Sequence, residues 1–364
     1  MTIFTSFLMK TRHTMRIVID EKIPYLRDAL EQMGHSVTAM PGQAIDNSDL
    51  AVADALFVRT RTHCNAALLD NTPVRFIGTA TIGHDHIDKE YCRQRGIVWT
   101  NAPGCNADAV LQYVQSCIYC WARSNSIDKL QGLTLGIVGV GQIGSRVERW
   151  AREAGLTVLL NDPPRAERGE GDFVPLSLIA QECDIITFHT TLSKSGIHPS
   201  YHLADAAFLD SLQRCRLLIN ASRGPVVDNS ALLNAIDNKR IAAVALDVWE
   251  NEPQLNHGLL EKAFIATPHI AGYSAEGKIN ASRMMVEAFA QFSRYTEPLP
   301  AMSLPAPAQP KMSAATLPDA LLYIYNPLDD TTLLKSSPDR FEELRNNYNL
   351  RREPKAYTIE IKKR

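Results

Sequence analysis

Three polar side chains in the second half of the chain are of the types that the oxidation of a hydroxyl group requires. His269 can accept the hydroxyl proton, Glu252 can orient the imidazole and stabilise its charged form, and Arg223 can hold a substrate carboxylate through two hydrogen bonds. Each residue follows an apolar run typical of a buried strand, and ligands of parallel α/β sheets bind at the carboxyl ends of strands. A lone arginine or histidine at such a position is more often structural, so the hypothesis of an active site depends on all three.

A glycine motif nearer the middle of the chain predicts the acceptor of the hydride. Gly139, Gly141 and Gly144 follow the apolar residues 133–138 and precede a helical pattern, which is the context of a dinucleotide-binding fingerprint. The next apolar run ends at Asp162, eighteen residues after the last glycine, where NAD-binding folds place an acidic side chain for the ribose hydroxyls. A glycine-rich turn without a ligand would not need this acidic residue. We therefore predict a site for NAD.

The alternation of apolar runs and helical patterns predicts an α/β protein with two doubly wound parallel sheets. Strands of the first domain are expected at residues 16–20, 36–40, 56–60, 75–79 and 97–100. Strands of the second domain are expected at residues 133–138, 157–161, 185–189, 217–221, 243–248 and 264–266, the number of a complete Rossmann domain. Helices at residues 24–33, 107–123 and 275–295 are also expected, the second of them capped by Asn106.

These elements define the domains that we expect. A flavodoxin-like substrate-binding domain spans residues 15–105 and is completed by residues 272–296, and an NAD-binding Rossmann domain spans residues 106–271. A proline-rich linker at residues 297–310 leads to a small C-terminal domain, residues 311–364, with an amphipathic segment at 341–348. Residues 1–14 are expected to be a disordered extension, with Met15 as an alternative start.

The overall composition indicates a globular protein of the cytoplasm. The 364 residues carry a formal charge of −2 at pH 7, which gives no reason to expect nucleic acid or a membrane as a partner. No apolar run is long enough to span a bilayer. The seven cysteines are scattered, and Cys117 and Cys120 lie in a helical pattern, where core packing is expected rather than a redox or metal role. We therefore expect no bound metal.

The order of the motifs resembles one known family. A glycine loop, then NASRG at residues 220–224, DVWENEP at 247–253 and TPHIAG at 267–272, is similar to the D-isomer-specific 2-hydroxyacid dehydrogenases. In that family the matching arginine binds substrate, the glutamate supports the histidine, and the histidine is the acid/base. The motifs APGCNA at 102–107 and DPPR at 162–165 resemble, more closely, the branch that oxidises 4-phospho-D-erythronate at C2 with NAD in vitamin B6 biosynthesis.

The resemblance also implies a set of binding residues. Substrate contacts are implied at Thr60, Thr81 and Tyr273, and a homodimer is implied through residues 311–364. Arg59 and Arg61 have the charge that a substrate phosphate needs, but a solvated loop explains them equally well. The NAD contacts that the resemblance implies are Gly139, Gly141, Gln142, Ile143, Gly144, Asp162, Thr190, Asp247 and Gly272.

Three departures from the family pattern stand out. His84 replaces a small residue, and Gln112 takes a position that is commonly acidic. The chain ends soon after Tyr357, so whether it forms the family's dimer interface is an open question at this point. Two other functions stay open at this point. One is a sister dehydrogenase that acts on 3-phosphoglycerate or glycerate, and the other is a non-catalytic protein that senses NAD(H) with the same fold.

Overall fold

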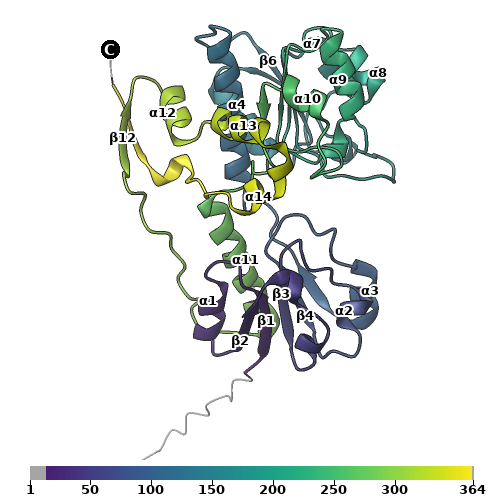
Figure 1. Cartoon of the computed structure of the whole chain (residues 1–364), viewed down its shortest axis with the longest axis vertical. Coiled ribbons are helices and arrows are strands. Elements are labelled where there is room, and N and C mark those ends of the chain that lie inside the picture. Colours follow the sequence, from purple (N-terminus) through teal and green to yellow (C-terminus); the bar gives the residue numbers. More distant parts are fainter. Residues whose placement is uncertain (1–13, 363–364) are drawn as a thin grey trace, which may run out of the picture. The chain divides into compact units, whose positions relative to one another are not determined.

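The computed structural model describes residues 14–362, and its chain divides into two compact units (Figure 1). The first unit comprises the described residues up to Cys105 together with Lys278–Leu304. The second unit comprises Asn106–Gly277 together with the described residues from Pro305 onward. The expectation of a disordered extension at residues 1–14 falls, apart from Thr14, outside the described part of the chain.

The first unit is built on a parallel sheet of flavodoxin type. Its strand order, β2-β1-β3-β4-β5, places the first strand between the second and the third. The strands are β1 (Arg16–Asp20), β2 (Ser36–Met40), β3 (Ala55–Val58), β4 (Phe76–Thr79) and β5 (Val98–Thr100). The helices are α1 (Leu26–Gln32), α2 (Ala66–Leu69), α3 (Lys89–Arg95) and α11 (Ala275–Ser293), which comes much later in the sequence.

An aromatic cluster joins α11 to the first sheet. The Phe289 ring of α11 lies 5.6 Å from Phe57 of β3 and 5.4 Å from Phe76 of β4, and all three side chains are buried. Tilted and edge-on aromatic pairs of this kind add to the free energy gained from burial. Residues that are far apart in the sequence therefore form one hydrophobic core. The predicted helix at residues 275–295 is present as α11 and returns to the first sheet.

The second unit contains a six-stranded parallel sheet among the described residues, in the order β11-β10-β9-β8-β6-β7. Its strands are β6 (Thr134–Val138), β7 (Thr157–Asn161), β8 (Ile185–Phe188), β9 (Leu217–Asn220), β10 (Ala243–Leu246) and β11 (Ile265–Ala266). The order reverses between β6 and β8, which creates the switch point where ligands bind in doubly wound sheets. Beyond β7, the Val174 N–H donates to Leu160 O at 2.7 Å, which fastens this segment to the edge strand.

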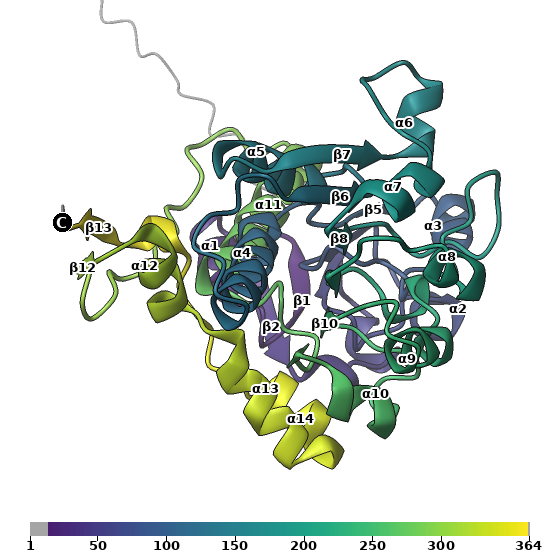
Figure 2. The same cartoon turned by 90° about the horizontal axis from the view of Figure 1, so that it is seen from above.

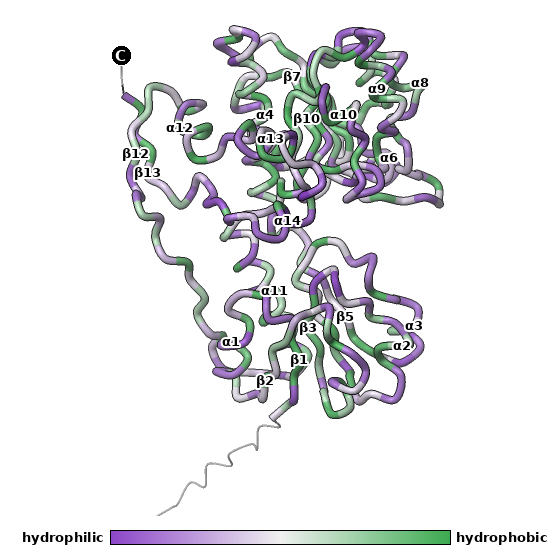
Figure 3. The backbone as a smooth tube through the Cα atoms, viewed as in Figure 1, coloured by the Kyte–Doolittle hydropathy of each residue, from purple (hydrophilic) through white to green (hydrophobic). Residues whose placement is uncertain are grey.

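Helices cover both faces of this sheet, and the strands run through the most apolar part of each unit (Figure 3). The long helix α4 (Ala107–Ser124) and α5 (Gly144–Glu153) contribute to one core cluster, and α7 (Leu176–Glu182), α8 (Ala206–Asp210), α9 (Asn229–Asp237) and α10 (His257–Lys262) contribute to the other. Cys117 and Cys120 of α4 are both buried in the first of these clusters. The prediction of two doubly wound α/β sheets is confirmed.

Asn106 differs from its prediction. It occupies the N-cap position of α4, but its side chain caps no helical N–H group. Its amide instead lies directly against Gly272, where a Cβ would collide with it. The prediction that the Asn106 side chain caps α4 is therefore wrong. The side chain contacts Gly272 and does not bind an N–H group of the helix.

The described C-terminal residues 305–362, called here the C-terminal segment, belong to the second unit and pack against its α/β part. They form β12 (Lys311–Ala314), α12 (Leu317–Ile324), α13 (Pro327–Ser336), α14 (Phe341–Asn346) and β13 (Thr358–Ile361), and β12 pairs with β13 in parallel. Helix α12 lies beside α4 (Figure 2), and α13 contacts the edge strand β11. Leu334 and Phe341 are fully buried in the core of the second unit. Of these elements, the sequence predicts only the amphipathic segment that contains α14.

None of the described helices is both long and apolar enough to cross a membrane.

Candidate active site

The glycine loop leaves a space for an anionic ligand at the switch point of the second sheet. Gly139 has φ of +89°, and a Cβ there would lie 2.8 Å from the backbone after β8, while a Cβ on Gly144 would collide with the Gly139 carbonyl. Nothing lies within 4 Å of the position where a Cβ on Gly141 would stand. The first and last glycines are thus required by packing, and the middle one keeps open the approach to the N-terminus of α5, where phosphates bind.

A cavity of about 580 Å³ lies in front of this loop. Its lining combines loop backbone with three cationic side chains, and the lining residues are Val140, Gly141, Gln142, Ser145, Arg146, Arg149 and Arg165. Open loop backbone and guanidinium groups are suited to a pyrophosphate. The residues present therefore fit NAD.

Asp162 stands at the edge of this cavity, directly after β7. Its carboxylate accepts the Val140 N–H at 2.8 Å and the Arg165 N–H at 3.2 Å, and so it fastens the glycine loop to the start of α6 (Pro163–Glu167). The guanidinium of Arg165 donates to the Val140 carbonyl at 2.6 Å and pairs with Glu170 at 2.9 Å. Asp162 directly follows β7, where NAD-binding folds place the acidic residue for the ribose hydroxyls, and a negative charge at that position disfavours a 2′-phosphate.

Thr190 lies two residues after β8, with its backbone against the first glycine of the loop. Its hydroxyl is buried and has no hydrogen-bond partner within the described protein. A buried hydroxyl without a partner is costly unless a ligand or water completes it. The backbone N–H of Thr190 lies directly over Gly139, so this unused hydroxyl is at the same crevice as the glycine loop.

The buried carboxylate of Asp247 holds the turn that follows His269. It accepts the Thr267 hydroxyl at 2.7 Å, the Ile270 N–H at 2.7 Å and the Ala271 N–H at 2.9 Å. Burial raises the pKa of Asp247, whereas the nearby His269 and these donors act in the opposite direction. The sequence predicts Asp247 as a cofactor contact, and its carboxylate oxygens are engaged by protein donors.

His269 and Glu252 form a direct pair. His269 Nδ1 donates to Glu252 Oε2 at 2.8 Å, and the other oxygen of Glu252 accepts the Trp249 N–H at 2.9 Å. Burial opposes the charge of Glu252, but His269, this N–H group and Arg345 together lower the pKa of its carboxyl. The carboxylate therefore fixes the tautomer in which Nε2 of His269 is free to accept a proton.

Arg223 comes from the loop that follows β9. The side chain of Asn220 accepts the Ser222 N–H at 3.1 Å and donates to the Arg223 carbonyl at 3.1 Å, which closes a tight turn. A Cβ on Gly224 would collide with the Trp249 carbonyl, so this loop lies directly against the loop of Glu252. The second unit therefore brings together the loops of the three residues that the sequence predicts to act jointly.

Two predicted substrate residues belong to the first unit. Thr60 follows β3 and is exposed, and Thr81 follows the neighbouring strand β4. Thr81 donates its hydroxyl hydrogen to the Gly83 carbonyl at 2.8 Å. Thr79 must then donate to Thr81 at 2.8 Å, and His86 Nε2 must donate to Thr79 at 2.9 Å. The chain leaves an acceptor lone pair on Thr81 for a ligand.

The two arginines considered for the substrate phosphate, Arg59 and Arg61, already have partners within the protein. Arg59 pairs with the buried carboxylate of Asp20, through Nε at 2.9 Å and a second nitrogen at 3.3 Å. A bidentate pair of this kind commits the guanidinium to the fold. Arg61 is exposed, and it also has an interaction partner.

Arg351, which the sequence analysis does not single out, clamps the segment after His269 from the C-terminal side. Its buried guanidinium donates to the carbonyls of Ile270 and Tyr273, both at 3.0 Å, and to that of Ala271. Its Nε also donates to the side-chain oxygen of Gln112 at 3.1 Å, so this departure from the family pattern lies in the same contact. A basic residue just beyond the amphipathic segment 341–348 is the only sequence signal for this contact.

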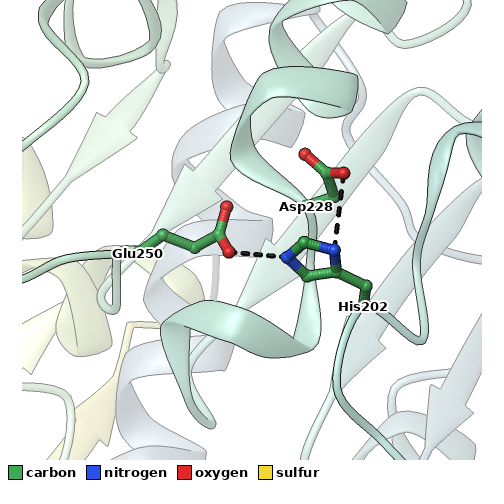
Figure 4. A group of neighbouring side chains, drawn as sticks. All are labelled: His202, Asp228 and Glu250. Atoms are coloured by element: carbon green, nitrogen blue, oxygen red, sulfur yellow. Dashed lines mark hydrogen bonds and ion pairs between the residues drawn. The ribbon is translucent and has the colours of Figure 1, made fainter.

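One cluster outside this site has the residue types of a metal centre. Figure 4 shows His202 between Glu250 and Asp228, with Nε2 at 2.6 Å from Glu250 and Nδ1 at 3.5 Å from Asp228. One ligand atom from each residue lies within 4.8 Å of the others, but the two carboxylates contact different ring nitrogens, which is the geometry of a hydrogen-bonded link. The imidazole instead links the loop of Glu250 to the start of α9.

The comparisons with known proteins agree with this geometry. Residues 107–271 match the family model of the D-isomer specific 2-hydroxyacid dehydrogenase, NAD binding domain. The structure resembles 3-phosphoglycerate dehydrogenase of Entamoeba histolytica, with a TM-score of 0.65, 23% identity and coverage of 78% of this chain and 96% of that one. D-lactate dehydrogenase from Aquifex aeolicus gives a TM-score of 0.62 at 23% identity, with 77% and 95% coverage. The fold and the site thus define an NAD-dependent 2-hydroxyacid dehydrogenase.

Relatives of known name show to which family within this class the chain belongs. Erythronate-4-phosphate dehydrogenase of Bacteroides thetaiotaomicron is 50% identical over 346 residues, which cover 95% of this chain and 99% of the relative. The enzymes of that name from Escherichia coli O81 and Porphyromonas gingivalis are 44% and 42% identical, with at least 92% of each chain covered. The chain therefore belongs to the erythronate-4-phosphate dehydrogenase family.

The buried His86, next to the Thr79 and Thr81 hydroxyls, should make the stability of the protein depend on pH. Burial, with the nearby His63 and His84, lowers the pKa of His86 to about 4 from an ordinary value of 6.5. Between these values the unfolded chain binds a proton that the folded chain does not, so the free energy of unfolding falls as pH falls. We expect His86 to account for about 2 kcal/mol of this loss.

Urea unfolding of the His86→Gln variant at pH 6.5 and pH 4.5 measures that contribution. The difference in free energy between the two pH values should be smaller in the variant than in the parent. His257→Gln, which removes an exposed imidazole from α10, is the matched control. An unchanged difference in His86→Gln would mean that His86 does not titrate as described.

Proposed function

We propose that this enzyme oxidises 4-phospho-D-erythronate at C2 to (R)-3-hydroxy-2-oxo-4-phosphobutanoate, with NAD as acceptor, in the synthesis of pyridoxal 5′-phosphate. The observation that carries the proposal is the His269–Glu252 pair at 2.8 Å beside the Arg223 loop, in a chain that is 50% identical to an erythronate-4-phosphate dehydrogenase. The pair has the chemistry of a 2-hydroxyacid oxidation, and the relative's name specifies the hydroxy acid.

Each residue of the site has one role in this proposal. Arg223 binds the C1 carboxylate and polarises the oxygen at C2. Nε2 of His269 accepts the proton of the C2 hydroxyl as the C–O bond becomes a carbonyl, and Glu252 stabilises the resulting imidazolium through Nδ1. NAD, when bound, accepts the hydride that leaves C2. In the reverse reaction His269 returns the proton to the carbonyl oxygen.

The remaining predicted residues bind the two ligands in this proposal. Tyr273, Thr60 and Thr81 offer hydroxyl groups to the substrate. The residues that hold the cofactor are Gly139, Gly141, Gln142, Ile143, Gly144, Asp162, Thr190, Asp247 and Gly272. The open position at Gly141 and the unpaired Thr190 hydroxyl support this assignment. For Asp247, the support is its hold on the turn that precedes Gly272 rather than a free carboxylate oxygen.

The domain roles follow from these assignments. The first unit, up to Cys105 with Lys278–Leu304, is proposed as the substrate-binding domain, because Thr60 and Thr81 follow its neighbouring strands β3 and β4. The second unit carries the cofactor. We place the enzyme in the cytoplasm, where its metabolic reaction fits.

A steady-state assay with 4-phosphoerythronate and NAD tests the proposed substrate. We expect kcat/KM for this compound to exceed that for 3-phosphoglycerate, which is one carbon shorter, by roughly ten- to two-hundredfold, because the site must accommodate the additional carbon and hydroxyl. Equal or reversed values would favour a sister dehydrogenase. NADH binding without turnover of either compound would favour a non-catalytic sensor.

Replacement of His269 tests the proposed base. In His269→Asn, kcat should fall by at least about a hundredfold, because proton transfer loses its acceptor, while the affinity for NADH stays within about twofold. Fluorescence titration of NADH and stopped-flow kinetics measure the two quantities. His257→Asn controls for the loss of an imidazole in the same unit and should keep the parent rate. Turnover at the parent rate in His269→Asn would remove His269 from the mechanism.

We also propose that the C-terminal segment forms a homodimer. Apolar side chains are exposed along it, among them Tyr323 at 76%, Leu333 at 54% and Leu317 at 47%. Exposed apolar patches on a stable protein commonly mark an interface.

Light scattering after size-exclusion chromatography tests the dimer. We expect twice the chain mass for the parent and a shift toward the single-chain mass in Tyr323→Glu and Leu333→Glu, because a buried charge destabilises the interface. Val52→Glu, at a side chain of the first unit that is 52% exposed, is the control and should stay dimeric. A parent that elutes as a single chain would contradict the proposal.

A further inference from the structure

Helix α14 of the C-terminal segment brings a cation to the catalytic pair. Arg345 Nη1 lies 3.9 Å from Glu252 Oε2, the same oxygen that accepts the hydrogen bond from His269. The side chain of Tyr273, a residue to which the proposed function assigns a substrate contact, is also close enough to stabilise the charge of Arg345 and raise its pKa. A residue seventy-six positions after His269 therefore belongs to the same site.

The surrounding contacts fix this position. The Tyr348 ring packs edge-on against the Tyr273 ring, with centroids 6.2 Å apart. Arg351 donates to the Tyr273 carbonyl at 3.0 Å, and the Arg351 carbonyl accepts the Ala275 N–H at 3.0 Å. Tyr273 and its neighbour Ala275 are thus held by residues that directly follow the helix that carries Arg345. All of these residues lie within the second unit.

The Arg345 guanidinium keeps its charge and part of its surface accessible. Burial disfavours the charged form, but Tyr273 and Glu252 outweigh it and raise the pKa of Arg345. The side chain is 22% exposed. Its contacts with Glu252 at 3.9 Å and with Glu342 at 4.0 Å are longer than direct hydrogen bonds. The guanidinium can therefore still donate to a ligand.

The proposed substrate needs a cation that the other arginines do not supply. Its carboxylate and its phosphate lie at opposite ends, and Arg223 binds the carboxylate. Arg351 is committed to backbone carbonyls and Gln112, and Arg59 of the first unit is committed to Asp20. Arg345 is an arginine of the catalytic neighbourhood in the second unit whose contacts leave room for a further anion. A guanidinium beside a phenol hydroxyl matches the acceptor oxygens of a phosphate.

We propose that Arg345, together with the Tyr273 hydroxyl, binds the terminal phosphate of the substrate and makes the enzyme specific for phosphorylated hydroxy acids. This inference rests on the proposed function. The two doubly wound sheets are complete without the described residues after Leu304, so the C-terminal segment adds substrate specificity to a two-domain dehydrogenase scaffold.

Paired measurements on two ligands test this assignment. In Arg345→Gln, the KM for 4-phosphoerythronate should rise roughly ten- to hundredfold, because a hydrogen bond to a charged group is lost. The inhibition constant of erythronate, which lacks the phosphate and competes for the same site, should change by less than about twofold. Arg345→Lys restores the charge without the planar fork, so its KM should lie between those of Arg345→Gln and the parent.

Arg340→Gln is the matched control, because Arg340 lies five residues earlier, is exposed and pairs with Glu343. It should leave both constants unchanged. Circular dichroism and thermal unfolding identify any variant that does not fold, in which case Arg345→Lys alone carries the comparison between the two ligands.

Other results overturn the inference. Equal increases for both ligands, or an unchanged KM with a lower kcat and an altered pH–rate profile, would mean that Arg345 acts only through Glu252. Unchanged constants would place Arg345 outside the site. A parent enzyme that does not oxidise 4-phosphoerythronate would refute the proposed function instead, and the parent assay alone detects that case.

Discussion

The active site depends on two opposite charges that hold one short segment of backbone. Asp247 accepts the N–H groups of Ile270 and Ala271, and Arg351 donates to the carbonyls of Ile270, Ala271 and Tyr273. Asp247, which follows strand β10, therefore holds the N–H groups of this turn. Arg351 of the C-terminal segment holds its carbonyl groups. Buried backbone groups must be paired, and charged partners give the strongest pairs.

This clamp explains how His269 can be held where a base is needed. The residue has φ of +58°, a left-handed conformation that costs a side chain other than glycine about 1 kcal/mol. Its own N–H donates to the Asp247 carbonyl at 2.8 Å, and its ring is held by Glu252. The strained residue is thus fixed at its backbone by one acidic residue and at its side chain by another. Neither fixation uses Nε2, which remains available for proton transfer.

The sequence alone predicts the parts of this arrangement that depend on local patterns. The glycine loop, the strands and the order of Arg223, Glu252 and His269 follow from apolar runs and from the residues directly after them, so their positions could be derived without a structure. Asn106 shows the limit of such reasoning, because the residue type of a cap does not reveal that Gly272 lies in reach of its side chain.

Arg345 and Arg351 could not be predicted for a related reason. Both act on residues more than seventy positions away, and an arginine in an amphipathic segment, or just beyond one, is usually a solvated side chain. Helices α12 and α13 were missed because they are short and packed by contacts with α4 and β11 rather than marked by a strong periodicity of their own. The fold of the C-terminal segment thus depends on contacts with residues that are far away in the sequence.

The same charges also affect the proton transfer. When His269 accepts a proton, the new positive charge lies against Glu252 and near Asp247, whose pKa it lowers, while Arg345 stands on the far side of the shared Glu252 oxygen. Two carboxylates thus stabilise the imidazolium, and one guanidinium opposes it. An anionic group bound to Arg345 would reduce that opposition. A phosphate at this position would therefore favour the protonated base electrostatically, and substrate recognition and acid/base chemistry would depend on the same side chain.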